Sequence, residues 1–240
     1  MKSSLTIAIP LFNEEDGVEN LYKELNKEIQ YLQEFVDLNI VLVNDGSTDR
    51  TQELLESFFK DDLFQIITHK KNLNLDGFLR TSISMCSTDY VAFLDSDCTY
   101  SPKLITEMLK ILNTDIDVIN ASPWHPDGCV VGLSKFRQFV SKFANFIYRT
   151  ILNKKVYTSS SILKLYKLET IKDIEIKSNG FVAITELFCK TLLKNTNYVE
   201  FPCQLTVRIY GNSKIQFTST VFNHLKFILQ LLLLKIRSKN

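Results

Sequence analysis

The sequence predicts an α/β protein with a mostly parallel sheet and helices on both of its faces. In the first half, short apolar runs alternate with segments whose apolar residues recur at helical spacing. Near-continuous apolar strands are typical of parallel sheets that are buried on both faces. Polar clusters follow three of these runs. In such sheets, ligands bind outside the carboxyl ends of the strands.

The elements of the first half follow one another in regular alternation. Apolar runs predict strands, and a stripe from Val18 to Leu32 marks the first helix. Proline favours the first turn of a helix, so a helix is expected to begin at Ser101 and Pro102. The other expected elements are strands over 5–9, 38–43, 64–68 and 90–94, and helices over 14–33, from Thr48 or Asp49 to Phe59, and over 76–86.

The second half is less regular. Helices are predicted over 132–152 and 180–193, and strands broken by Pro202 over 198–209. We expect one domain over residues 1–214, followed by an amphipathic helical tail over 215–240.

Composition excludes several classes of protein. The 240 residues are 45% hydrophobic and 23% charged, which favours a globular core over disorder. A formal net charge of +1 gives no general argument for nucleic-acid binding. The five cysteines are scattered, without a Cys-x-x-Cys pair, so reduced thiols in the cytoplasm are expected. No signal peptide and no spanning helix is predicted.

Asp95-Ser96-Asp97 directly follows the apolar run 90–94. Two carboxylates this close resist ionising together, and a divalent cation would relieve the repulsion. Mg²⁺ commonly uses one or two carboxylates together with substrate phosphates. A solvated turn after a strand explains the tripeptide alone equally well.

Asn44-Asp45-Gly46-Ser47-Thr48-Asp49 also follows a predicted buried strand. Its acidic side chain could hydrogen-bond a ribose or a base edge, and Gly46 allows a tight turn. An Asx turn with a helix cap is the structural alternative. The chain has neither a G-x-G-x-x-G fingerprint nor a Walker loop, so dinucleotide and P-loop enzymes are disfavoured.

These motifs together resemble the family 2 glycosyltransferases of the GT-A fold. The resemblance implies a nucleotide-sugar donor, GDP- or UDP-linked, and a DxD element at Asp95 and Asp97 that holds Mg²⁺ or Mn²⁺. The residues that carry it are Ile9-Pro10-Leu11-Phe12-Asn13-Glu14-Glu15, Val43 to Asp49, Lys71-Asn72 and Phe93-Leu94-Asp95-Ser96-Asp97. The implied donor-binding residues are Pro10, Phe12, Asn13, Glu14, Asp45, Gly46, Ser47, Lys71, Asn72, Asp95 and Ser96.

The second half is similar to the dolichyl- and polyprenyl-phosphate sugar transferases. The matching residues are Arg137, Ser141 and Asn145, then Gly180-Phe181 with Glu186-Leu187, then Arg208, Gly211 and Ser213-Lys214. The resemblance covers residues 5–214 and implies a lipid phosphate acceptor. It departs from the family at Lys164, where an arginine is usual, which leaves the sugar and the acceptor open.

The implied reaction inverts the anomeric centre by direct displacement. Arg137, Ser141, Arg208 and Lys214 are expected to hold phosphate, and an arginine beside a hydroxyl suits a phosphate monoester. Arg137, Ser141 and Asn145 share one helix face by their spacing. Asp97, Glu186 and Arg137 are the expected catalytic residues. Glu186 is the candidate carboxylate, or else an ordinary helix-surface glutamate.

A lipid acceptor requires contact with a membrane surface. The tail from Thr218 to Arg237 has a polar face and an apolar face, which suits a helix in the headgroup plane. Packing on the protein itself or in a dimer is the alternative. A phenylalanine stripe in the helix over 132–152 is a second membrane candidate, or a core face: Phe136, Phe139, Phe143 and Phe146.

The expected location is cytoplasmic, peripheral on the cytoplasmic face of a membrane, and a homo-oligomer or a membrane partner stays open. Two other functions also remain open. One is a soluble family 2 transferase with a glycan hydroxyl acceptor, which would need a general base. The other is a non-catalytic subunit that binds nucleotide or lipid. His125 could line the sugar pocket or serve as a structural loop residue.

Overall fold

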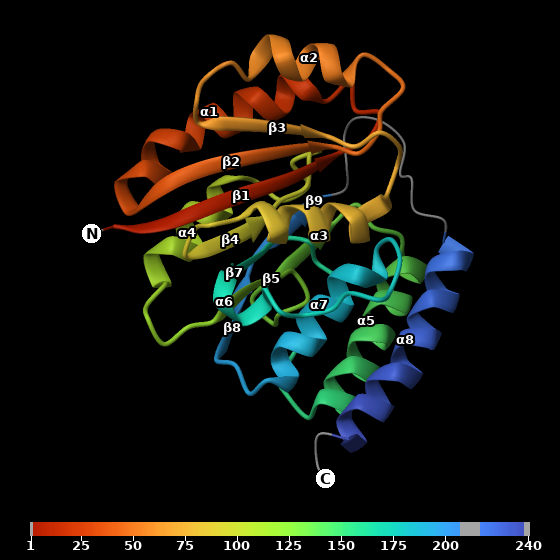
Figure 1. Ribbon diagram of the computed structural model, residues 1–240. Helices are drawn as coiled ribbons and strands as arrows, with labels where there is room; N and C mark the ends of the chain where they lie inside the picture. Colours follow the sequence, from red (N-terminus) through yellow and green to blue (C-terminus); the bar gives the residue numbers. More distant parts are fainter. Residues whose placement is uncertain (1, 207–216, 238–240) are drawn as a thin grey trace.

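The computed structural model describes residues 2–206 and 217–237. Its centre is a seven-stranded sheet, which Figure 1 shows between layers of helices. The strand order is β3-β2-β1-β4-β7-β5-β8. Among the described strands of this sheet, β7 alone runs antiparallel to its neighbours. The strands are β1 (Ser3–Leu11), β2 (Val36–Asn44), β3 (Phe64–Thr68), β4 (Tyr90–Phe93), β5 (Val118–Ser122), β7 (Lys164–Lys167) and β8 (Tyr198–Pro202), with β6 (Cys129–Val131) and β9 (Gln204–Thr206) paired in parallel apart from them.

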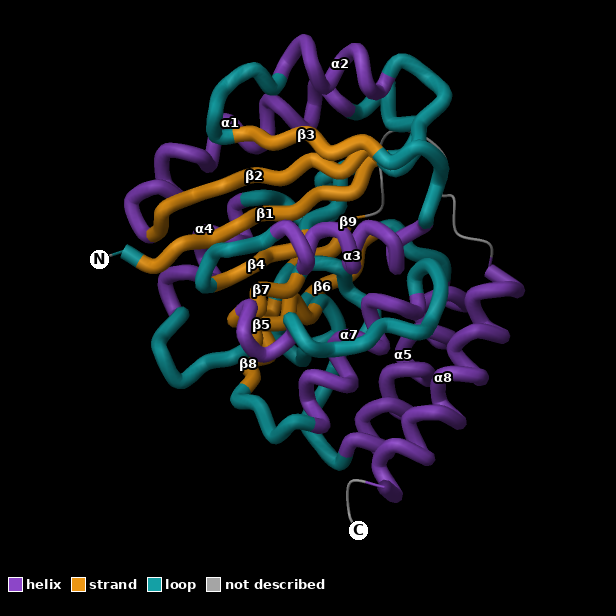
Figure 2. The backbone as a smooth tube through the Cα atoms, viewed as in Figure 1, coloured by secondary structure: helices purple, strands orange, loops and turns teal. Residues whose placement is uncertain are grey.

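Helices cover both faces of the sheet. Helix α1 packs against α2 and α4. Helix α3 lies in front of the sheet in Figure 2 and packs against α7. The last helix, α8, packs against α5 and α7. The helices are α1 (Val18–Phe35), α2 (Thr51–Phe58), α3 (Asn74–Met85), α4 (Lys103–Ile111), α5 (Lys135–Leu152), α6 (Leu168–Ile171), α7 (Val182–Leu193) and α8 (Phe217–Arg237).

The core lies between these layers. The predicted stripe of α1 is buried at Val18, Leu21, Leu25 and Leu32. The central strands are buried on both faces, as their continuous apolar runs predicted. Each fully buried aliphatic side chain contributes about 1.5–3 kcal/mol. The predicted α/β class with a mostly parallel sheet is therefore confirmed.

Some boundaries differ from prediction for local reasons. Helix α1 begins at Val18 instead of Glu14, because Asn13 has a positive φ of 49° and a turn follows it. Helix α5 begins at Lys135, because the Ser134 side chain accepts a hydrogen bond from the Arg137 amide and caps the helix. The sequence did not predict β7, which is short and has a lysine at each end.

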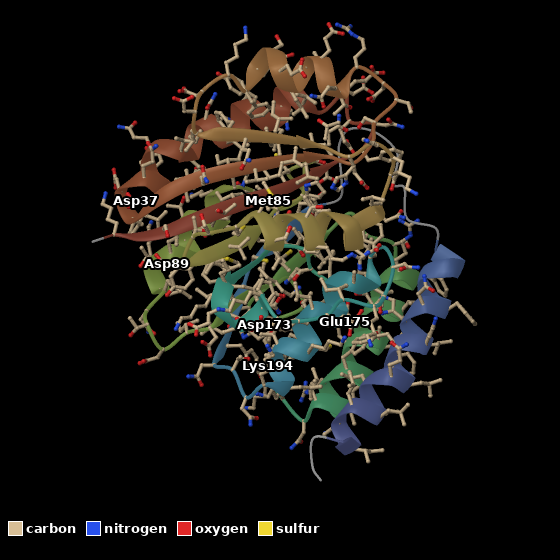
Figure 3. The ribbon with its side chains drawn as sticks, in the orientation of Figure 1. Asp37, Met85, Asp89, Asp173, Glu175 and Lys194 are labelled. Atoms are coloured by element: carbon tan, nitrogen blue, oxygen red, sulfur yellow. The ribbon has the colours of Figure 1, made fainter. Side chains whose placement is uncertain are left out.

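The two rims of the sheet differ in character. Asp37 and Asp89 lie at the amino-terminal rim, near the start of β2 and β4 (Figure 3). There Asp89 accepts hydrogen bonds from the amide and the hydroxyl of Ser4, at 2.8 and 2.9 Å. The candidate site is at the opposite, carboxyl-terminal rim.

Candidate active site

Three polar segments meet at the carboxyl-terminal rim. Strand β1 lies between β2 and β4, and all three run in the same direction. Leu11 pairs with Asn44, and Ala8 with Phe93, so the residues after each strand emerge side by side. The structure thus gathers most of the predicted donor-binding residues: Pro10, Phe12, Asn13 and Glu14 from β1; Asp45, Gly46 and Ser47 from β2; and Asp95, Ser96 and Asp97 from β4.

The loops after β1 and β2 are fastened to each other. Asn13 accepts a hydrogen bond from the Thr48 amide at 2.8 Å, and its own amide donates to the Ser47 hydroxyl at 2.9 Å. The Glu14 amide donates to the Thr51 hydroxyl at 2.8 Å. Asn13 and Ser47 therefore shape the rim by binding each other's loops.

Gly46 brings a third loop against this pair. Its φ is +72°, and a Cβ there would lie 2.4 Å from the Lys71 carbonyl carbon and 2.6 Å from the Asn72 amide. Only glycine fits this backbone and this close approach. The predicted donor-binding residues Lys71 and Asn72 are thereby held against the β2 loop.

Asp45 is the buried acid of the rim. Its Oδ1 accepts hydrogen bonds from His69 Nδ1 at 2.7 Å and from the Leu73 amide at 2.8 Å. His69 Nε2 lies 2.9 Å from the Thr81 hydroxyl on α3. Sequence reasoning found no role for His69. The available signal was its place directly after β3, which pairs with β2, the strand that Asp45 follows.

Asp95 and Asp97 are half-buried at the end of β4. Asp97 accepts a hydrogen bond from the Thr99 amide at 3.0 Å, which fixes the turn. Burial, together with the negative charges of Glu24, Asp97 and Asp95, raises the pKa of the Cys98 thiol to about 12. Asp95 and Asp97 place two carboxylates in one short turn, which suits a divalent cation.

The donor set fits a metal that substrate completes. No group of three His, Cys, Asp or Glu side chains able to hold a metal occurs in residues 2–206 and 217–237. Two carboxylates plus substrate phosphates is a set that Mg²⁺ commonly accepts. Asp95 and Asp97 therefore fit a cation that binds together with a diphosphate.

A cavity of about 410 Å³ opens beside the rim at the start of α3. Asp76 connects two parts of the cavity lining. Its carboxylate pairs with Arg80 on the same helix and accepts a hydrogen bond from the Gly180 amide, before α7, at 2.8 Å. Arg80 also donates to the Ile176 carbonyl. The lining residues are Lys71, Asn72, Leu73, Asn74, Asp76, Gly77, Arg80, Thr81 and Asn179.

Glu186 lies in a closed environment on α7. Its carboxylate accepts from the Lys177 and Ser178 amides at 3.0 and 2.5 Å and pairs with Lys190 at 2.5 Å. Burial opposes ionisation of Glu186, but the hydrogen bonds from Lys190 and Ser178 outweigh it and hold the pKa below its usual range. These contacts favour an anchor for the loop before α7 over the expected general base.

The predicted phosphate-binding face of α5 divides into two parts. Arg137 is exposed in the first turn. Ser141 accepts from the Trp124 indole at 3.0 Å, and Asn145 is buried. Asn145 Oδ1 accepts from the amide and the hydroxyl of Ser159, at 2.8 and 2.7 Å. Arg137 is thus open to a ligand, whereas Asn145 fastens the loop around Ser159.

Lys164 lies in the centre of a buried polar network that the sequence did not predict. Its ammonium donates to the Ser159 carbonyl at 3.3 Å and to both oxygens of Ser161, and it lies 4.9 Å from the Phe188 ring. Burial lowers its pKa to about 7, although the Glu200 carboxylate opposes this shift. Lys164 therefore organises the loop that Asn145 also holds.

Two predicted phosphate-binding residues, Arg208 and Lys214, lie outside the described residues. The same is true of the Gly211 and Ser213 positions of that motif. His125 is packed against the Tyr157 ring, with centroids 4.9 Å apart, in a loop beside Trp124.

Comparison with known proteins identifies the family. Residues 6–174 match the family model described as glycosyl transferase family 2. The chain belongs to this family. Among solved structures, this family 2 chain is similar to glucosyl-3-phosphoglycerate synthase of Mycobacterium tuberculosis in complex with Mn²⁺, UDP and glucosyl-3-phosphoglycerate. The TM-score is 0.68 at 16% identity, over 97% of this chain and 80% of the other. The expected GT-A fold is confirmed.

Curated relatives of this family 2 chain carry names of lipid-phosphate sugar transferases. Dolichol-phosphate mannosyltransferase of Pyrococcus furiosus is 25% identical over 230 residues, 95% of this chain and 63% of that protein. Undecaprenyl-phosphate 4-deoxy-4-formamido-L-arabinose transferase of Pseudomonas fluorescens is 24% identical over 212 residues, 88% and 59% respectively. The chain thus spans about three fifths of the length of these two relatives.

Proposed function

We propose that this family 2 domain transfers a sugar from a GDP- or UDP-linked donor to a polyprenyl phosphate, with inversion. One observation carries the proposal: the buried Asp45 and the Asp95–Asp97 pair emerge at the same rim of one sheet. A buried acceptor for a nucleoside and a half-buried pair for a cation together suit a nucleoside diphosphate. The names of the two curated relatives support the acceptor class.

The rim residues divide the work of donor binding. Asp45 accepts from the nucleoside, while Asn13, Gly46 and Ser47 hold the loops that surround it. Lys71 is exposed beside the cavity and lies where a cationic side chain can meet the diphosphate. Mg²⁺ or Mn²⁺ held by Asp95 and Asp97 would neutralise charge on the leaving diphosphate.

In this proposal the protein has to position the acceptor phosphate but does not have to remove a proton from it. A phosphate monoester is already ionised at neutral pH, so no base must remove a proton before it attacks. Arg137 is exposed and can bind phosphate through its fork of N–H donors. Glu186 is engaged by Lys177, Ser178 and Lys190, so it anchors a loop in this proposal.

Acceptor assays test the proposal. Purified protein with Mn²⁺ or Mg²⁺ and a panel of UDP- and GDP-sugars should glycosylate polyprenyl phosphate but not the matching polyprenol. Arg137→Gln should raise the KM for the lipid phosphate at least about tenfold, because a charged hydrogen-bonding partner is lost. The KM for the donor should change little.

Lys135→Gln is the matched control, because Lys135 is an exposed cation two residues away on the same helix. Transfer to a glycan hydroxyl and not to the lipid phosphate would favour the soluble transferase. Absence of both transfer and donor hydrolysis would favour a non-catalytic subunit that binds nucleotide or lipid.

A membrane-facing surface is the second part of the proposal, which places the protein peripherally on the cytoplasmic face. No helix within residues 2–206 and 217–237 is long and apolar enough to cross a bilayer. Instead, α5 and α8 lie side by side (Figure 1). Both helices expose apolar side chains. We define the apolar ridge as Phe136, Phe139, Phe143 and Phe146 of α5 with Phe222, Leu225, Leu229, Leu232, Leu233 and Ile236 of α8.

Helix α8 has two different apolar faces. Phe227 and Leu231 are buried against the protein, and His224 lies 2.7 Å from the Tyr148 hydroxyl of α5. Leu229 stays 64% exposed, and Phe139 of α5 67%. Packing on the protein therefore explains one face only. A headgroup region suits the other, since Lys142, Arg149 and Lys226 are exposed cations on the same two helices.

Flotation with anionic liposomes tests the apolar ridge. The combined variant Phe139→Ser, Leu225→Gln and Leu229→Gln should lose most liposome binding and keep its fold. These side chains are exposed, so little core packing is lost. Deleting residues 216–240 is a less clear test, since it would also uncover the partners of Phe227 and Leu231. Met85→Gln, on exposed Met85 of α3, is the control. Equal flotation of all three proteins would contradict membrane attachment through the ridge.

A further inference from the structure

The Asp45 carboxylate is held by a chain of hydrogen bonds that starts on α3. Thr81 on α3 lies 2.9 Å from His69 Nε2, and His69 Nδ1 lies 2.7 Å from Asp45 Oδ1. The His69 ring is nearly buried, with 9% side-chain exposure. Since a carboxylate only accepts, Nδ1 is the donor in this contact. Both ring nitrogens are therefore engaged, and the ring cannot turn without losing two hydrogen bonds.

The two oxygens of Asp45 are not equivalent. Oδ1 receives both the His69 ring and the Leu73 amide, at 2.7 and 2.8 Å. A carboxylate oxygen has two lone pairs, so these two donors saturate it. The side chain keeps 6% exposure, and both of these hydrogen bonds from described residues end on Oδ1, not on Oδ2. One oxygen remains to accept a hydrogen bond from a ligand.

We propose that His69 is a positioning residue that holds Asp45 with one open oxygen, and that this arrangement selects a uracil base over guanine. The inference rests on the proposed function, because it assumes that a nucleotide binds at this rim. Uracil offers one imide N–H between two carbonyl groups, which matches a single acceptor. Guanine offers two adjacent donors, which a carboxylate matches best with both oxygens free.

The neighbouring backbone reinforces this selection. The Leu73 amide that occupies Oδ1 belongs to the loop that passes over Gly46, where a Cβ would already overlap Lys71. Asp45 therefore cannot turn to offer both oxygens without breaking the contact that closes this loop. Guanine would leave one donor unpaired or displace the loop, and an unpaired buried donor is costly.

Binding of UDP and GDP, each with Mn²⁺, to the full chain tests the inference by isothermal titration calorimetry. Wild type should bind UDP at least about tenfold more tightly than GDP, the effect of one well-placed hydrogen bond. His69→Leu should weaken UDP binding about tenfold and reduce the UDP-to-GDP ratio. His69→Asn should restore most of both, because its amide N–H can replace Nδ1–H at nearly the same position.

Melting temperatures measured without nucleotide separate positioning from folding. If His69 acts on the base, the nucleotide ratio falls in His69→Leu and recovers in His69→Asn, whatever happens to the melting temperature. A wild type that binds UDP and GDP equally, or prefers GDP, would overturn the inference and leave the proposed donor class intact. A His69→Leu variant with wild-type affinities would do the same. A wild type that binds neither nucleotide would overturn both the inference and the proposed function.

Discussion

Asp97→Ala is expected to abolish sugar transfer while the protein still folds. Asp97 lies at the end of β4, half-buried, and its Oδ1 accepts from the Thr99 amide at 3.0 Å. Loss of that contact should cost about 1 kcal/mol of stability. Loss of one of two carboxylates at the proposed cation site should lower kcat by about a thousandfold or more, since the charge growing on the leaving diphosphate would no longer be neutralised.

The measurement is transfer from the nucleotide sugar over a range of Mn²⁺ concentrations, together with a thermal-shift titration of Mn²⁺ and nucleoside diphosphate. Asp37→Ala is the control, because Asp37 is an exposed aspartate at the opposite rim of the same sheet (Figure 3). It should transfer sugar like wild type. Full metal-dependent activity in Asp97→Ala would remove Asp97 from the cation site.

Gly46→Ala is expected to cause the largest loss of stability among single methyl additions at the rim. The new Cβ would lie 2.4 Å from the Lys71 carbonyl carbon, at a backbone φ of +72°. The backbone strain costs about 1–3 kcal/mol. Forcing Lys71 and Asn72 away adds about 1–3 kcal/mol of overpacking. The same movement displaces the Leu73 amide from Asp45, so nucleotide binding should weaken as well.

Gly180→Ala separates the two causes. Gly180 also has a positive φ, of +60°, but a Cβ there meets no atom within 4 Å. The Gly180→Ala variant should therefore lose only the stability that backbone strain costs, about 1–3 kcal/mol. Its nucleotide affinity should change little. Urea denaturation and UDP titration of both variants provide the comparison. Equal losses for the two glycines would show that contact with the Lys71 loop has no energetic role.

The sequence could predict those candidate site residues that directly follow an apolar strand. Asp45, Asp95 and Asp97 directly follow continuous apolar strands, and parallel strands bring their carboxyl ends to one rim. The family motifs therefore predicted that these three acids lie at one rim, as the strand pairing has them. They gave no role to His69, because a single histidine after a strand has no pattern of its own.

Contacts within the site needed the tertiary structure. Glu186 fitted a motif for a catalytic carboxylate, but Lys177, Ser178 and Lys190 occupy its oxygens. In the sequence, Lys164 stood out only as a lysine where the family usually has an arginine. Antiparallel pairing of β7 between β4 and β5 buries it completely.

By itself, the sequence determined the family, the order of alternating strands and helices in its first half, and the rim that carries the acidic residues. These follow from local periodicity and from residues adjacent in the chain. Only the tertiary structure decided that His69, after β3, holds Asp45, after β2, that Gly46 meets Lys71, and that α8 packs one apolar face and exposes the other. Such contacts join residues distant in sequence, and hydrophobic periodicity carries no information on which buried partner a polar side chain meets.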